Sequence, residues 1–278
     1  MTDKYAVIGN PIAHSKSPLI HHMFAEQTGQ DISYEAILAP LDGFAATVER
    51  LRNEGYKGCN VTVPFKFEAL QLATCVEPRA KIAKAVNTLK FANNEIIGGN
   101  TDGIGLTDDL QFNLKIDLKN KRVLLVGAGG AASGVVHSLA SLSAIVTIVN
   151  RNMEKAQLLA TPRSPFPASD SGRIDALGYA DLVDQQFDII INATSTGLSD
   201  EMPNIPKSIF EHALLAYDMM YGRETSFMKF AREHGAAVVS DGLGMLVEQA
   251  AESFFIWRNM HPDSQAVLKK LRAELPIA

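Results

Sequence analysis

A glycine-rich turn between two apolar runs is the segment of this chain best suited to holding a phosphate group. Val123–Val126 is short and rich in β-branched residues, which predicts a buried strand, and the string GAGGAA follows it at 127–132. A helical pattern then extends to about Leu142, and Ile145–Val149 predicts a second strand. Strand, glycine turn, helix and strand in this order predict a β-α-β unit with the G-x-G-x-x-A spacing of a dinucleotide-binding turn.

Each position of that turn has a distinct use in holding a pyrophosphate. Gly127 permits a tight turn, Gly129 lets the backbone approach the ligand, and Ala132 is small enough for close packing of the helix on the strand. The start of the helix adds backbone N–H groups and the positive end of its dipole. The alternative, a glycine-rich turn without a ligand, is disfavoured by the elements on either side.

The end of the second predicted strand indicates which dinucleotide is bound. NAD-binding units usually carry Asp or Glu there, to hold the ribose 2′-hydroxyl. This chain carries Asn150 and Arg151 instead, with Lys155 one helical turn further on. A guanidinium suits a 2′-phosphate or stacks on adenine, whereas an ordinary exposed arginine is the less favoured alternative. The sequence therefore predicts NADP as the cofactor.

Polar residues also gather at the end of a predicted strand in the first third of the chain. Asn60 and Thr62 alternate with two valines, so their side chains share one face of that strand. Pro64 ends the strand and opens a helix, which leaves Lys66 in the first helical turn. Local physics leaves two interpretations of Lys66 open, a reactive amine or a solvated surface residue.

A second polar cluster follows. Ala85–Leu89 predicts a strand that carries Asn87, and Asn93-Asn94 predicts a hairpin turn into a strand at Glu95–Ile97. Asp102 then precedes a helical stretch and could be only its N-cap or a turn residue. Polar groups recur at strand ends, and this recurrence favours a common site over separate structural roles.

Two serines lie in the loop after the first predicted strand. Pro18 suits the first position of a helix that extends to about Thr28, and Ser17 then becomes its N-cap. Hydroxyls at such a helix start, those of Ser15 and Ser17, suit a carboxylate ligand, although plain capping remains the alternative for Ser17. His21-His22 has no partner at metal-ligand spacing, so we expect surface histidines and no metal site.

Composition excludes several classes of protein. The chain has 278 residues, 46% of them hydrophobic and 21% charged, which predicts a globular protein of about two domains. A net charge of −5 argues against nucleic acid or an anionic membrane as the main partner. The N-terminus has no signal-peptide pattern, no run is long enough to span a bilayer, and only two cysteines are present. We therefore expect a cytoplasmic protein.

A set of longer strings points to a family. GNPIAHSKSP, NVTVPFK, AVNTL, NTDG, GAGGAA, NATSTG, YDMMY and DGLGMLVEQAA occur in this order and resemble those of the shikimate dehydrogenases over nearly the whole chain. The resemblance implies a two-domain α/β fold. Residues 1–101 with 241–278 would form an α/β substrate domain with a mostly parallel sheet, and residues 102–240 a Rossmann-type doubly wound NADP-binding domain, with the site in the cleft between them.

The same resemblance implies an activity and a set of site residues. The activity is the NADP-dependent, reversible reduction of 3-dehydroshikimate to shikimate on the route to chorismate and the aromatic amino acids, by a monomer or homodimer. Lys66 and Asp102 would be the catalytic pair. The substrate would be held by Ser15, Ser17, Thr62, Asn87, Asp102, Tyr221 and Gln249, and the cofactor by Gly127, Ala128, Gly129, Gly130, Ala131, Asn150, Arg151, Lys155, Met219 and Gly242.

Some features depart from the family pattern, and two alternatives stay open. Asn152 stands where Thr is common, Lys84 replaces a usual small residue, and Gly99 stands where an acidic residue is common. The proline-containing stretch Thr161–Asp175 aligns with no motif and predicts a surface loop. The alternatives are a quinate/shikimate dehydrogenase that also uses NAD, and a non-catalytic protein that senses NADP or shikimate; the intact Lys66 and Asp102 disfavour the latter.

Overall fold

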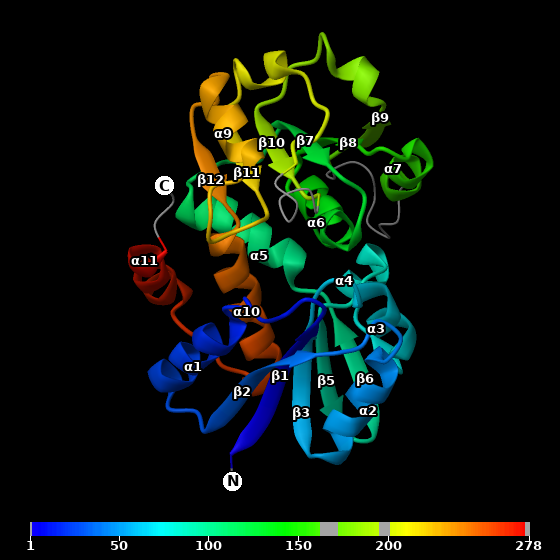
Figure 1. Cartoon of the computed structure of the whole chain (residues 1–278), viewed down its shortest axis with the longest axis vertical. Helices are drawn as coiled ribbons and strands as arrows, with labels where there is room; N and C mark the ends of the chain where they lie inside the picture. The colour runs from blue at the N-terminus through cyan, green and yellow to red at the C-terminus, as the bar shows by residue number, and fades with distance from the viewer. Residues whose placement is uncertain (1, 162–171, 195–200, 276–278) are drawn as a thin grey trace. The chain divides into compact units, whose positions relative to one another are not determined.

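The computed structural model describes residues 2–161, 172–194 and 201–275, and the chain forms two compact units (Figure 1). The first unit comprises Met1–Leu106 and Leu246–Lys269, and the second comprises Thr107–Met245 and Lys270–Ala278. Each unit contains its own six-stranded sheet, and the two sheets differ in strand direction. The predicted α/β class with two domains is confirmed.

The first unit is built on a mixed sheet in the order β2-β1-β3-β5-β6-β4. β5 runs antiparallel to both of its neighbours, β3 and β6, whereas the other neighbouring pairs are parallel. The sheet is therefore mostly parallel, as the resemblance implied. Its strands are β1 (Asp3–Gly9), β2 (Ile32–Leu38), β3 (Tyr56–Val61), β4 (Cys75–Val76), β5 (Thr88–Ala92) and β6 (Glu95–Gly99).

Helices connect and cover these strands. The long helix α10 carries Trp257, whose indole stacks on Tyr5 at 4.6 Å and donates from Nε1 to the Leu89 carbonyl at 3.0 Å. A Cβ at Gly58 would collide with both the indole and that carbonyl, so glycine is required under the tryptophan. The helices are α1 (Ser17–Thr28), α2 (Phe44–Asn53), α3 (Lys66–Leu72) and α4 (Pro78–Ala83), with α5 (Asp102–Asp108), α10 (Leu243–Arg258) and α11 (Ser264–Glu274) divided between the two units.

Local predictions in this unit have mixed outcomes. The hairpin turn at Asn93-Asn94 is confirmed, because both residues have positive φ and join β5 to β6. The strand predicted over Ala85–Leu89 is wrong in its first half, since β5 begins only at Thr88. The N-cap prediction for Ser17 is also wrong: α1 begins at Ser17 itself, after Lys16, and no side chain caps it.

The second unit is a parallel sheet in the order β12-β11-β10-β7-β8-β9. Counted from the first strand of the unit, this is the 3-2-1-4-5-6 order of dinucleotide-binding folds, in which ligands bind where the order reverses. Here the reversal lies between β7 and β10, and the glycine turn follows β7 directly. The strands are β7 (Arg122–Val126), β8 (Ile145–Val149), β9 (Ile174–Leu177), β10 (Ile189–Asn192), β11 (Leu215–Asp218) and β12 (Val239–Asp241).

Burial explains why these strands read as continuous apolar runs. Leu124, Val126, Ile190 and Ala216 are fully buried in one cluster, as expected for a parallel sheet covered on both faces. The surrounding helices are α6 (Gly130–Ser141), α7 (Met153–Ala160) and α9 (Ser226–Glu233), with short turns of helix at Asp109–Asn113, Tyr179–Leu182 and Lys207–Phe210.

Two sequence predictions fall partly outside the described residues. Most of the predicted loop at Thr161–Asp175 lies there, and β9 begins before its end, at Ile174. The second half of the NATSTG string also lies outside them. Among the residues that the structure describes, no helix combines the length and apolar character needed to cross a membrane.

Candidate active site

A nearly buried ion pair is the centre of the polar site in the first unit. Lys66 Nζ lies 2.6 Å from Asp102 Oδ2, and the two side chains are 15% and 1% exposed. Lys66 is the first residue of α3 and Asp102 the first of α5, so two helix starts bring the charges together. The surface interpretation of Lys66 is wrong. A proton donor in contact with a buried carboxylate is suited to acid–base chemistry.

Asn87 joins this pair to the C-terminal part of the chain. Its Nδ2 lies 2.9 Å from Asp102 Oδ1 and 3.1 Å from Gln249 Oε1, the latter on α10. Its Oδ1 accepts from the backbone N–H of Thr101 at 2.9 Å. The structure therefore brings together Lys66, Asn87, Asp102 and Gln249 from distant parts of the sequence.

The backbone around Asp102 is fixed by a neighbouring amide. Asn100 is 5% exposed, accepts from the Asp102 N–H at 3.0 Å and donates to the Ala85 carbonyl at 2.9 Å. One side chain thus satisfies two buried main-chain groups and holds the start of α5 against the segment before β5. Asn100 was assigned no role in the sequence analysis, where it occurs only within the NTDG string.

Sequence reasoning also omitted a hydroxyl and amide cluster beneath Asn87. Asn60 Nδ2 lies within hydrogen-bond distance of the Asn87 carbonyl (3.2 Å), Thr88 Oγ1 (3.1 Å) and Ser253 Oγ (2.9 Å). The strand alternation placed Asn60 on a polar face. The one signal for Ser253 was its position four residues after Gln249, on the same side of α10.

Ser15 and Thr62 lie in adjoining loops, and Ser17 is the first residue of α1. The Ser17 N–H donates to Ser15 Oγ at 3.3 Å, and Ser17 is 8% exposed. Thr62 follows β3, and its N–H donates to the Ile8 carbonyl at 2.9 Å. A Cβ at Gly9 would collide with the Thr62 methyl group, so glycine allows the first loop to approach Thr62.

The side chains next to this cluster are uncharged. Burial lowers the pKa of His21 to about 3, and the His21 ring stacks on Tyr34 at 4.1 Å. Burial also raises the pKa of Tyr34 well above its usual value. His21 is fully buried, so the expectation of a surface histidine is wrong for it, whereas His22 is exposed and lies 3.3 Å from Glu26. His21 and Tyr34, the two ionisable rings on the Asn60 side of the cluster, are thus uncharged near pH 7.

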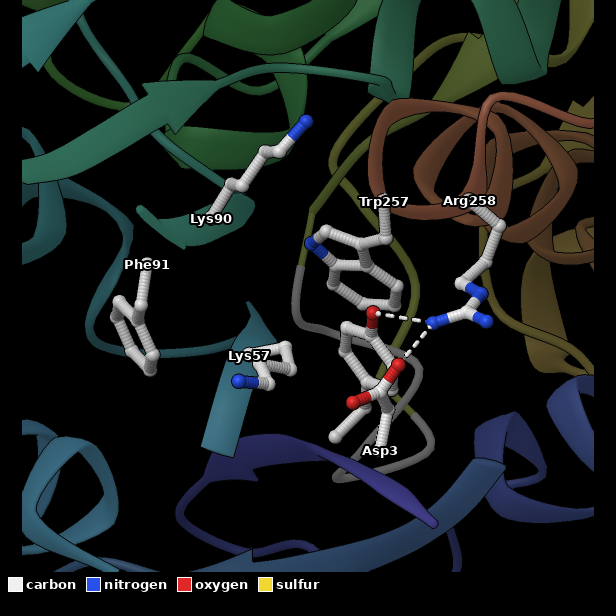
Figure 2. A pocket seen from close by; sticks show the side chains of 7 residues that line it. Asp3, Lys57, Lys90, Phe91, Trp257 and Arg258 are labelled. Carbon is white, nitrogen blue, oxygen red and sulfur yellow. Dashed lines mark hydrogen bonds and ion pairs between the residues drawn. The ribbon is translucent and has the colours of Figure 1, made fainter. Parts of the chain in front are cut away.

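A separate hollow of about 190 Å³ is lined by the first residues of β1 and β3, by Lys90 and Phe91 of β5 and by the end of α10, away from the strand ends that carry the site (Figure 2). Two of its three cations have partners within the molecule. Lys90 Nζ donates to the Ile256 carbonyl at 2.9 Å, and Arg258 pairs with Asp3 at 2.5 Å. This hollow contains none of the predicted site residues, and it offers less to an anion than its charges alone suggest.

The glycine turn of the second unit fits a dinucleotide phosphate. Gly127 has a φ of +112°, which side chains rarely adopt, and is buried against the backbone of Ala193. Gly129 is exposed, and a Cβ built on it would meet nothing within 4 Å. α6 begins at Gly130, so Ala128, Gly130 and Ala131 lie at a helix start with open space before it.

The end of β8 carries exposed cations. Arg151 and Lys155 are both exposed, on the segment that leads into α7. Asn152 accepts from the Lys155 N–H at 3.1 Å and caps α7. Asparagine caps helices as well as threonine does, so the Asn152 that replaces the common Thr preserves the helix cap. Asn150 donates to the Asn152 carbonyl at 2.9 Å. Tyr179 was missed by the sequence analysis. Burial raises the pKa of its hydroxyl, and the nearby Arg151 guanidinium lowers it by a smaller amount.

Met219 and Gly242 are in contact. A Cβ at Gly242 would collide with the Met219 carbonyl, and the Gly242 N–H donates to the Met220 carbonyl at 2.8 Å. Asp218 directly precedes Met219. Burial raises the pKa of its carboxyl group, and hydrogen bonds from Thr225 and other neighbours offset part of that rise. The predicted substrate residue Tyr221 belongs to this second unit, and its role stays a prediction.

The strand order, the glycine turn and the buried Lys–Asp pair define an α/β dinucleotide-binding oxidoreductase class. Family models match three parts of the chain: the shikimate dehydrogenase substrate binding domain at residues 7–89, shikimate/quinate 5-dehydrogenase at 110–213, and the shikimate 5′-dehydrogenase C-terminal domain at 242–272. The chain belongs to the shikimate dehydrogenase family, as its motifs predicted.

Individual relatives agree with this assignment. The chain is 55% identical over 272 residues to "Shikimate dehydrogenase (NADP(+))" of Methylobacillus flagellatus, covering 98% of this chain and 99% of the relative. Among solved structures it is similar to an Ael1 enzyme from Pseudomonas putida, with 45% identity, a TM-score of 0.89, and 97% and 98% of the two chains covered. It is also similar to the Thermus thermophilus shikimate 5-dehydrogenase in complex with NADP(H) and shikimate, with 31% identity, a TM-score of 0.83, and 99% and 100% covered.

Proposed function

We propose that this protein is an NADP-dependent shikimate dehydrogenase, which reversibly reduces 3-dehydroshikimate to shikimate. The observation that carries the proposal is the Lys66–Asp102 pair, buried and in direct contact within a chain 55% identical to an enzyme of that name. When bound, the reduced cofactor NADPH would donate the hydride and the oxidised form NADP⁺ would accept it. The residues of the chain must therefore bind and orient the substrate and move one proton.

The proton step is assigned to the ion pair. In the reducing direction, the Lys66 ammonium is a donor for the oxygen that becomes the hydroxyl, and the Asp102 carboxylate holds the amine in place. In the oxidising direction, the hydroxyl proton goes either to the neutral Lys66 amine, which becomes the ammonium again, or to the Asp102 carboxylate. Lys66 Nζ and Asp102 Oδ2 are already within hydrogen-bond distance of each other, at 2.6 Å, so little reorganisation of the pair is required.

Substrate binding is assigned to neutral groups around the pair. Asn87 and Gln249 offer amides next to Asp102, and amides suit the hydroxyls of a polyhydroxylated ring. Further hydroxyls come from Ser15 and Thr62 in the adjoining loops and from Ser17 at the start of α1, and we assign the two serines to the substrate carboxylate. Tyr221 completes the proposed set.

Cofactor binding is assigned to the second unit. The turn Gly127–Ala131 suits the pyrophosphate, because Gly129 leaves open space at the start of α6. Asn150, Arg151 and Lys155 suit the adenosine 2′-phosphate, since two of them are exposed cations. Met219 and Gly242, which touch each other, are assigned to the nicotinamide side.

The same assignments divide the chain by function. Residues 1–101 with 241–278 are proposed as the substrate-binding catalytic domain, and 102–240 as the NADP-binding domain. The compact units have borders at Leu106 and Leu246, close to two of these limits, whereas Lys270–Ala278 groups with the second unit. We further propose a monomer or homodimer in the cytoplasm, where the free thiols Cys59 and Cys75 stay reduced.

A crossed assay tests the proposal. Purified enzyme is given shikimate or quinate with NADP or NAD, and formation of the reduced nicotinamide is followed by its absorbance. We expect shikimate with NADP to have by far the highest kcat/KM. Comparable rates with quinate and NAD would indicate a quinate/shikimate dehydrogenase, whereas NADP binding without turnover of any pair would indicate a sensing protein.

A further inference from the structure

Asn87 has its amide orientation fixed by the main chain. The Thr101 backbone N–H can only donate, and it lies 2.9 Å from the Asn87 atom assigned as Oδ1. The opposite end of the amide must therefore be the nitrogen, which donates to Asp102 Oδ1. Asn60 is fixed in the same way, because one of its amide atoms lies 3.2 Å from the Asn87 carbonyl, which can only accept.

Thr88 lies between these two oriented amides. Asn60 Nδ2 lies 3.1 Å from Thr88 Oγ1, and Thr88 Oγ1 lies 2.9 Å from Asn87 Oδ1. Since the amide nitrogen only donates and the amide oxygen only accepts, the Thr88 hydroxyl accepts from Asn60 and donates to Asn87. Ser253 Oγ, also 2.9 Å from Thr88, has the Gln249 carbonyl as an acceptor for its own proton.

The result is a chain of hydrogen bonds with a single direction. It begins at the Tyr34 hydroxyl, which donates to Asn60 Oδ1 at 2.7 Å, and continues through Thr88 and Asn87. Along this route each link donates toward Asp102, where the Asn87 N–H meets Oδ1 and leaves Oδ2 to Lys66, while the two amides also reach Ser253, Thr101 and Gln249 at the sides. Aligned hydrogen bonds polarise one another, so each link strengthens the hold on the carboxylate.

We propose that Thr88 is a positioning residue for the reaction: its hydroxyl aligns the Asn87 amide, which in turn holds the Asp102 carboxylate in the geometry that Lys66 requires. This inference rests on the proposed function of the Lys66–Asp102 pair. Thr88 is 1% exposed and touches none of the reacting groups itself, so it acts only through Asn87.

The test compares Thr88→Val with Thr88→Ser in the full-length enzyme. Valine keeps the shape of threonine but removes the hydroxyl. Asn87 Oδ1 then keeps only its contacts with the Thr101 N–H and hydroxyl, and Asn60 Nδ2 keeps only the Asn87 carbonyl and Ser253 Oγ. We expect Thr88→Val to lower kcat by about threefold to thirtyfold, from the usual worth of one or two buried hydrogen bonds, while KM for NADP changes by less than about twofold. Thr88→Ser keeps the hydroxyl, so its kcat is expected to stay close to that of the unmodified enzyme.

Thr47→Val is the matched control. Thr47 is 8% exposed in the same unit, and its hydroxyl donates to the Gly43 carbonyl at 2.8 Å within α2, away from the site. The Thr47→Val variant should have a melting temperature lowered about as much as that of Thr88→Val, and its kcat should be unchanged. If Thr88→Val also leaves kcat unchanged, or if Thr88→Ser loses as much kcat as Thr88→Val, the inference is overturned.

A double-mutant cycle separates this inference from the proposed function. If Thr88 acts through the carboxylate, Thr88→Val should have almost no further effect on kcat in an Asp102→Asn background. Full additivity of the two losses would overturn the inference while leaving the catalytic pair intact. Near-normal turnover of Asp102→Asn alone would instead refute the role proposed for the pair. Tyr34→Phe supplies a second variant. It removes the donor to Asn60 and also the Tyr34–Ser17 hydrogen bond, so we expect a smaller loss of kcat that disappears in the same background, with a separate rise in KM for shikimate.

Discussion

Replacing Lys66 by alanine should damage stability and turnover through different physical causes. The Asp102 carboxylate is 1% exposed, and the change removes its cationic partner at 2.6 Å. Loss of one member of a buried pair leaves an uncompensated charge, which costs about 3–5 kcal/mol of unfolding free energy. Loss of the proton donor should lower kcat by about 10²–10⁴-fold, the usual worth of general acid–base catalysis.

A second substitution separates the two effects. Lys66→Ala with Asp102→Asn removes the buried charge as well, so the double variant should regain much of the lost stability but none of the lost turnover. Urea unfolding measures the first quantity, and steady-state reduction of NADP by shikimate measures the second. The reasoning is refuted if Lys66→Ala keeps near-normal kcat and loses only affinity for shikimate, because Lys66 would then be a binding contact.

Three further predictions concern the cofactor, the substrate and pH. Arg151→Ala should raise KM for NADP about tenfold to a hundredfold, the worth of a charge-assisted phosphate contact, and leave KM for NAD almost unchanged; equal use of both cofactors by the unmodified enzyme would contradict this. Ser17→Ala should weaken shikimate binding by about 0.5–1.5 kcal/mol, and a variant that loses only thermal stability would assign Ser17 a structural role. His21 has a pKa of about 3 in the folded state against about 6.5 unfolded, so the unfolded chain binds the extra proton and stability falls as the pH drops through that window, by at most about 5 kcal/mol. His21→Phe should reduce that fall in urea titrations from pH 7 to pH 3, and an unchanged slope would exclude His21 as its source.

The nucleotide half of the molecule could be predicted from local pattern. The run Val123–Val126, the glycines after it and Ile145–Val149 form a contiguous β-α-β unit, so periodicity and turn chemistry were sufficient. Strand order was less accessible, because the pairing of β7 with β10 joins segments that are distant in the chain. The resemblance supplied the domain organisation, which periodicity alone would have left open.

The polar site was predictable only in part. Lys66 and Asp102 are 36 residues apart, so the resemblance and not spacing paired them. Thr88 and Ser253 were missed because each matters through hydrogen bonds to side chains on other elements, which the sequence does not place beside it. His21 was misjudged although it lies on the buried side of α1, three residues before Phe24, a spacing that could have indicated burial.

Helix starts were the weakest local predictions. Ser17 has the composition of an N-cap and precedes a proline, yet α1 begins one residue earlier than that pattern implies. The backbone of Lys16 is already helical, with φ −89° and ψ −4°, and Ser15 accepts from the Ser17 N–H. The competing local hydrogen bond of Ser15 thus decides where the helix begins.

The packing of Trp257 gives the molecule a built-in optical probe. It is the only tryptophan in the sequence, it is 8% exposed against Tyr5, and it belongs to the first unit. Indole emission therefore reports the melting of the first unit alone, whereas circular dichroism follows the helices of both units. Overlaying the two signals during thermal unfolding would show whether the units melt as one cooperative block or one after the other.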